Sequence, residues 1–128
     1  MAFNEDIAKA AKANEYFRKV LATGKFSQVV VMALKPGEDI GEEVHDDVDQ
    51  VLVCVEGDGK SVLEGKAGPF GVGHLVQVPA GTKHNFVNTG TTPMKLFTVY
   101  APPQHEPGTI HKTKAEAERA EAKKHHKK

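Results

Sequence analysis

The stretch Gly73-His-Leu-Val-Gln-Val-Pro79-Ala-Gly81-Thr-Lys-His84-Asn-Phe-Val-Asn88 carries the strongest structural signal in this chain. It predicts an apolar strand over 75–78, a tight turn, and a second strand over 84–88. Proline has no N–H to give to a sheet and so ends a strand, whereas glycine accepts the positive φ of a tight turn. The turn therefore places His84 at the start of a strand, with its side chain on one fixed face.

The β pattern extends on both sides of this stretch. Roughly eight short apolar runs at 8–12-residue spacing, separated by glycine and proline turns, predict an all-β sandwich or barrel. The Asp-Gly pair within residues 56–59 predicts a hairpin. The predicted strands cover 27–34, 40–44, 48–55, 60–64, 75–78, 84–88 and 94–100, and residues 16–21 form either a further strand or a helix end.

The length of 128 residues corresponds to one domain. We expect a short N-terminal helix and an arm in residues 1–25 and a β-barrel in residues 26–101. Residues 102–128 predict a proline-containing arm followed by a charged helical or disordered tail. Because this tail has almost no apolar face, we expect it to be solvated.

Charge and cysteine content restrict the partners and the compartment. Lys+Arg and Asp+Glu number 17 each, so no net basic field attracts nucleic acid or an anionic membrane. No apolar run is long enough to span a membrane, and the N-terminus does not resemble a signal peptide. Cys54 is the only cysteine, which is typical of a reducing compartment. We therefore expect a cytoplasmic protein that binds neither nucleic acid nor membrane.

Candidate partners for His84 lie before the first predicted hairpin. Glu43 and His45 are two residues apart, which puts them on one face of the same strand. Gln50 follows a bend at Asp46-Asp47 and returns to that face. Two imidazoles, one carboxylate and one amide oxygen suit a divalent first-row metal such as Mn, Fe, Co, Ni or Zn.

The two groups of residues together resemble the motifs of a small single-domain cupin, a family with a double-stranded β-helix or jelly-roll fold. The second cupin motif is Gly-x5-Pro-x-Gly-x2-His-x3-Asn. The first is Gly, five residues, His-x-His, three or four residues, Glu, six residues and Gly. The second motif is filled at every fixed position by Gly73, Pro79, Gly81, His84 and Asn88, and the first reads Gly37-x5-Glu43-x-His45-x4-Gln50-x6-Gly57.

The first motif keeps its spacing but departs in chemistry. Glu43 stands where the family has its first His, and Gln50 stands where it has Glu. The resemblance implies that His45 and His84 are metal ligands, that Glu43 is a ligand or a catalytic general base, and that Gln50 is a further ligand. It also implies that Asn88 braces a structural turn with Gly73, Pro79 and Gly81. Asp49 is a candidate hydrogen-bond partner for a ligating histidine.

Side-chain alternation and the resemblance also predict a pocket and an interface. Leu52, Cys54 and Phe86 should face inward with the ligands, and Tyr100 should reach their edge, which gives a small and mostly apolar pocket for a small-molecule ligand. Cupins of this size are commonly homodimers. Residues 29–31 would otherwise form an exposed apolar edge, so we expect a homodimer.

Two functions are open at this point. The first is a metal-dependent enzyme for a small oxygen-rich metabolite. Iron would favour dioxygenase-like chemistry, and zinc or manganese would favour chemistry like that of the sugar-phosphate isomerases of the superfamily, with Glu43 moving a proton. The second is a non-enzymatic module that binds or senses a metal or metabolite. Both need the same kind of pocket, so the sequence leaves the choice open.

Overall fold

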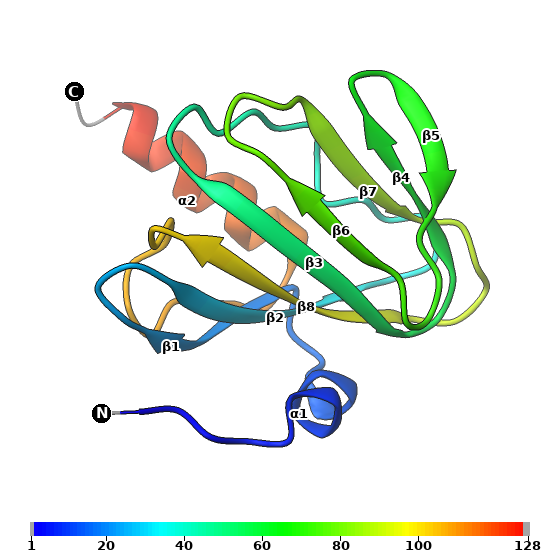
Figure 1. Cartoon of the computed structure of the whole chain (residues 1–128), viewed down its shortest axis with the longest axis horizontal. Coiled ribbons are helices and arrows are strands. Elements are labelled where there is room, and N and C mark those ends of the chain that lie inside the picture. The colour runs from blue at the N-terminus through cyan, green and yellow to red at the C-terminus, as the bar shows by residue number, and fades with distance from the viewer. Residues whose placement is uncertain (1, 127–128) are drawn as a thin grey trace.

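The computed structural model describes residues 2–126 of the chain, and side chains up to residue 123 (Figure 1). Two antiparallel sheets pack against each other, with a short helix before them and a charged helix after them, as the sequence predicts. The larger sheet has the strand order β6-β3-β8-β2-β1-β9, and the smaller has the order β5-β4-β7. The elements are α1 (Ile7–Ala13), β1 (Arg18–Thr23), β2 (Gln28–Leu34), β3 (Asp49–Glu56), β4 (Gly59–Leu63), β5 (Lys66–Pro69), β6 (Leu75–Val78), β7 (His84–Asn88), β8 (Met94–Ala101), β9 (Ile110–His111) and α2 (Lys114–His126).

The predicted strands agree well with the observed ones, apart from the run at 40–44. The runs 75–78 and 84–88 coincide with β6 and β7. Residues 16–21, for which the sequence allowed either a strand or a helix end, lead into strand β1. Two strands have no counterpart in the prediction: β5 follows a positive-φ turn at Gly65, and β9 lies beyond the prolines of the C-terminal arm. Both are short and are held by pairing with β4 and β1, so the local sequence contains little signal for them.

Two local predictions were wrong because strands that follow one another in the sequence pair with other strands than the local sequence suggests. Residues 56–59 do not form a hairpin, since β3 pairs with β6 and β8 whereas β4 pairs with β5 and β7. The connection instead crosses from one sheet to the other, with Gly57 at φ +93°. Residues 29–31 are not an exposed edge either, because β2 lies between β1 and β8. Val30 and Val31 are both buried, one on each face of the sheet.

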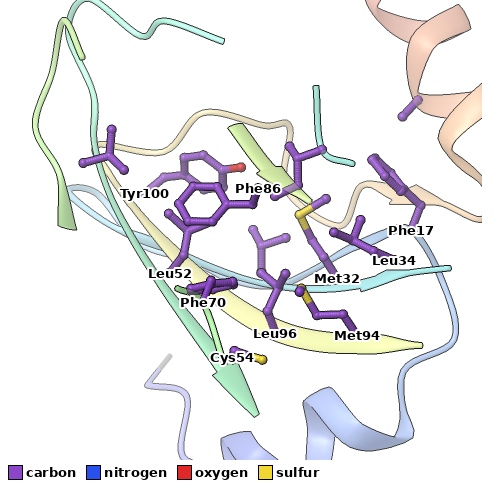
Figure 2. Packing of buried hydrophobic residues seen from close by; sticks show 14 of the residues in the cluster. Phe17, Met32, Leu34, Leu52, Cys54, Phe70, Phe86, Met94, Leu96 and Tyr100 are labelled. Atoms are coloured by element: carbon purple, nitrogen blue, oxygen red, sulfur yellow. The ribbon is translucent and has the colours of Figure 1, made fainter. Parts of the chain in front are cut away.

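The hydrophobic core lies between the two sheets and is selected by side-chain alternation. On β3, Leu52 and Cys54 are fully buried, while Val53 between them is only partly covered. Figure 2 shows the aromatic rings of Tyr100, Phe70 and Phe86 beside Leu52. The rings of Phe70 and Phe86 meet edge to face with their centroids 4.8 Å apart, an arrangement that aromatic pairs favour.

The two helices cover opposite faces of the six-stranded sheet (Figure 1). On the outer face, α1 lies over β2, β3 and β8, and Lys95 donates a hydrogen bond from Nζ to the Asn14 carbonyl. At the start of α2, Thr113 Oγ1 accepts a hydrogen bond from the Glu116 N–H. The described part of this helix is mostly exposed, as expected, but Ala117 is small enough to pack into the core cluster. Within the described part of the chain, neither helix is long and apolar enough to cross a membrane.

Asn88 ties the end of β7 to two other parts of the chain. Its Nδ2 donates to the carbonyls of Leu34 and Thr92, each at 2.9 Å, and its Oδ1 accepts from the Gly90 N–H at 2.9 Å. The side chain is fully buried. It therefore holds the end of β2 and the turn before β8 against the second motif strand.

Replacement of Asn88 should destabilise the fold, because the carbonyls of Leu34 and Thr92 and the Gly90 N–H would lose their partner. We expect Asn88→Ala to lower the free energy of unfolding by about 2–3 kcal/mol, as measured by urea denaturation. The exposed neighbour supplies a matched control, and Thr89→Ala should change the free energy by no more than about 0.5 kcal/mol. A loss as small as the control's in Asn88→Ala would contradict this role.

Candidate metal centre

Residues 37–45 run beside β7 but do not form a continuous strand. Only Asp39 and Glu43 make isolated bridges to β7, at Val87 and His84. Gly41 lies between them with φ +107°, and its N–H donates to the side chain of Asn85 at 2.9 Å. The prediction of a strand over 40–44 was therefore wrong, since positive φ interrupts the ladder there.

The pairing resumes at Glu43. The Glu43 N–H donates to the His84 carbonyl and the His84 N–H donates to the Glu43 carbonyl, both at 2.9 Å. Residues that exchange both backbone hydrogen bonds across an antiparallel pair have side chains on the same face. The second motif histidine is thus placed next to the carboxylate of the first motif.

Three of the four predicted ligands converge on one point. Glu43, His45 and His84 each offer a ligand atom, and these atoms all lie within 4.8 Å of one another. His45 Nε2 lies 3.8 Å from Glu43 Oε1, and the centroids of the two imidazole rings are 5.4 Å apart. Two imidazoles and one carboxylate at this separation match the ligand set of a divalent first-row metal.

Hydrogen bonding shows which atoms are available for coordination. His84 Nδ1 lies 2.9 Å from the Thr82 carbonyl, which can only accept, so Nδ1 carries a proton and Nε2 is the ring atom left for a metal. Gln50 Nε2 donates to Thr98 Oγ1 at 3.1 Å. The remaining buried atoms His45 Nε2, His84 Nε2 and Gln50 Oε1 have no hydrogen-bond partner among the described residues. Buried polar atoms without partners are rare in proteins, and a metal bound between the histidines would satisfy the two imidazole nitrogens.

Burial keeps His45 in the form that binds metal. Desolvation lowers the pKa of His45 below its ordinary value of 6.5, and the charges of His84 and Arg18 lower it further, whereas Glu43 opposes the shift. The imidazole is therefore neutral at pH 7, which is the protonation state required of a histidine ligand.

The remaining predicted residues are distributed unevenly around this centre. The Tyr100 ring lies 6.2 Å from the His45 ring, and the Phe86 ring lies 6.2 Å from the His84 ring. Leu52 is buried two positions beyond Gln50 on β3.

Cys54 and Asp49 do not lie with the ligands. Cys54 is four positions beyond Gln50, about 13 Å of strand, and its thiol lies 3.5 Å from the Glu56 carbonyl. Asp49 Oδ1 accepts a hydrogen bond from the Ala80 N–H at 2.8 Å. In this structure it is the Thr82 carbonyl, rather than Asp49, that orients a candidate ligand histidine.

A cavity of about 360 Å³ leads to the ligand cluster. Glu43 and His45 line it together with Arg18, and the helix α2 contributes Glu118 and Glu121. Sequence reasoning missed Arg18 entirely. Its signal was an arginine two residues before the apolar Val20 in a segment compatible with a strand, which places both on the same inward face.

The fold and the site define a cupin, and the chain belongs to this family: the family model described as "Cupin domain" matches residues 30–100. Among solved structures, the chain is similar to BH2720 of Bacillus halodurans, with a TM-score of 0.91 and 40% identity over 93% of this chain and 95% of that one. The predicted jelly-roll fold and the predicted resemblance to cupins are thereby confirmed.

Two curated relatives match at the level of sequence. The uncharacterized protein YrkC of Bacillus subtilis (strain 168) is 47% identical over 126 residues, covering 93% of this chain and 67% of YrkC. The uncharacterized protein L612 of Acanthamoeba polyphaga mimivirus is 38% identical over 108 residues, covering 76% of this chain and 63% of L612. The chain thus spans about two thirds of the length of each of these relatives.

The depressed pKa of His45 predicts acid sensitivity of the metal-free protein. The unfolded chain, with a pKa near 6.5, binds a proton at a higher pH than the folded chain does, so the free energy of unfolding should decrease as the pH falls below about 6.5. Urea denaturation between pH 7.5 and 5 in the presence of a chelator measures this slope. His45→Gln should flatten it, and the exposed His74→Gln should keep the wild-type slope. Equal slopes in all three proteins would contradict the assignment.

Proposed function

We propose that this cupin is an enzyme that uses a divalent metal ion to act on a small oxygen-rich metabolite. The observation that supports the proposal most is the convergence of Glu43, His45 and His84 at a cavity, with the Nε2 atoms of both histidines buried and without partners among the described residues. We place Gln50 as the fourth ligand, because its buried Oε1 is also unsatisfied within residues 2–126. The free thiol of the single cysteine is compatible with work in the cytoplasm.

The residues of the site divide the chemical work between them. A bound divalent metal would supply Lewis acidity, or oxygen activation in the case of iron. His45 and His84 act as metal ligands: burial holds His45 neutral, and the Thr82 carbonyl occupies His84 Nδ1 and leaves Nε2 for the metal. Glu43 lines the cavity and is partly exposed, so it is the residue that can accept a proton from a bound substrate. This supports dioxygenase-like or isomerase-like chemistry.

The metal content of the protein tests the site itself. A chain in which His125 and His126 are replaced by alanine removes the histidine pair of the tail as a competing site. Purified from its native host and analysed by plasma mass spectrometry, this protein should contain about one divalent ion per chain. His84→Ala should lose the ion, because a site that has lost one of its two imidazole ligands binds far more weakly. The exposed His74→Ala should retain it. Absence of metal from the wild type and His84→Ala alike would contradict the proposed centre.

The same preparation tests whether the protein is an enzyme. Oxygen uptake and product formation are measured with panels of catechols, diketones and sugar phosphates. Turnover that is lost in Glu43→Gln, with the metal retained, would assign proton transfer to Glu43. Stoichiometric metal with no turnover on any substrate class would favour the alternative of a metal- or ligand-binding sensor module.

We further propose that the protein forms a homodimer, although the strand first expected to mediate it is interior. Among the described residues β6 forms one edge of the larger sheet. Val72 is 66% exposed and Leu75 is 62% exposed there, which makes this edge the apolar surface that a second copy would cover. Size-exclusion chromatography with light scattering should give a dimer for the wild type and a monomer for Leu75→Glu. The exposed Phe26→Glu, away from this edge, should remain dimeric. A monomeric wild type would contradict the proposal.

A further inference from the structure

We propose that Arg18 binds a carboxylate group of the substrate, so that the site takes small carboxylic acids. This inference rests on the proposed function, because it assigns a substrate class to the same cavity. Arg18 lies on β1, is only 7% exposed and lines the cavity beside Glu43 and His45. A buried guanidinium that faces a cavity is a ready partner for an anion.

The surroundings of Arg18 fix its position next to the candidate ligands. The guanidinium donates a hydrogen bond to the Tyr100 hydroxyl, and the Tyr100 ring lies 6.2 Å from the His45 ring. On other sides, Nη1 lies 3.1 Å from His111 Nδ1, and Cζ lies 5.2 Å from the centroid of the Phe17 ring. Arg18 is therefore held on a rigid strand one aromatic ring away from the metal centre, which favours preorganised binding.

One donor of this buried group remains unused. Arg18 Nε is buried and has no hydrogen-bond partner in the part of the chain that the structure describes. An unsatisfied donor on a buried charge is costly, and a carboxylate that accepts from Nε and a neighbouring nitrogen removes the cost. The cavity therefore contains a buried donor, Arg18 Nε, without a hydrogen-bond partner among the described residues.

The other charges of the cavity favour a carboxylate over a phosphate. Lys114 also lines the cavity, but it forms an ion pair with Asp39. Glu118 and Glu121 of α2 are exposed and lie on the cavity wall, and Glu43 adds a further carboxylate. With one buried cation and several acidic neighbours, a singly charged carboxylate is accepted at lower electrostatic cost than a doubly charged phosphate.

Nitrogen-15 NMR observes the proposed contact directly. The chain contains two arginines, Arg18 and the exposed Arg119, so the spectrum should show two Nε–H signals, and Arg18→Lys assigns them. The probes are pyruvate, its neutral isostere pyruvamide, and inorganic phosphate, each titrated into metal-free and zinc-loaded protein at pH 7.5. We expect pyruvate to shift the Arg18 signal and leave Arg119 in place. Pyruvamide should cause no shift, and phosphate should bind at least tenfold more weakly.

Two variants test whether pyruvate binding depends on the charge of Arg18 or only on a cationic side chain in the cavity. Backbone amide shifts should show that Arg18→Gln weakens pyruvate binding at least tenfold while zinc binding is unchanged. Lys114→Gln, in the same cavity, should bind pyruvate within twofold of the wild type. If Arg18→Gln fails to fold, the wild-type titrations decide.

The results distinguish this inference from the proposed function. An Arg18 signal that does not respond to pyruvate, or that responds equally to pyruvamide, overturns the carboxylate assignment, as does tighter binding of phosphate. A selective response to pyruvate in a protein that binds no zinc supports the Arg18 assignment and overturns the metal-dependent enzyme.

Discussion

The site depends on two backbone hydrogen bonds, those that Glu43 and His84 exchange at 2.9 Å. They fix the register between the first motif segment and β7 at the point where both ligands emerge. A slip of one residue would turn the Glu43 side chain to the opposite face, because side chains alternate along extended backbone. These two hydrogen bonds are needed because Gly41, with a φ of +107°, interrupts the pairing with β7 just before Glu43. The segment leaves the strand conformation and returns to β7 in time to place one carboxylate beside one imidazole.

This arrangement concentrates unsatisfied polar atoms in one place. His45 Nε2, His84 Nε2, Gln50 Oε1 and Arg18 Nε are all buried without partners among the described residues. Each such atom costs about 1–3 kcal/mol. The rest of the fold shows the opposite pattern, with a continuous apolar core and a buried Asn88 amide whose donors and acceptor are all used. Stability therefore comes from the core, whereas the site holds polar groups that have no partners among the described residues.

The second motif could be predicted closely from the sequence, because its strands, turn and histidine are set by local chemistry. The pairing of Glu43 with His45 was also predicted, although the regular strand invoked for it is absent. Side-chain alternation failed for Cys54 in a different way. It predicts the face of the sheet on which a side chain lies, but not how far along the strand it lies from the candidate ligands. Side-chain alternation could put Arg18 on an inward face, but it could not place Arg18 in the site. Its neighbours His45, Tyr100 and His111 come together only through sheet pairing and the arm that follows β8.

The candidate metal ligands and Arg18 come from different parts of the chain, and this has a consequence for cupins of this kind. Residues 30–100, which match the family model, contain Glu43, His45, Gln50 and His84. Arg18 and Glu118 lie outside that range, on β1 and α2, and line the same cavity from the flanks. In the function proposed here, metal coordination and substrate recognition are thus carried by different segments. Because flanking segments can change without disturbing the paired motif strands, one metal centre can serve different substrates, and specificity has to be read from the segments that close the cavity.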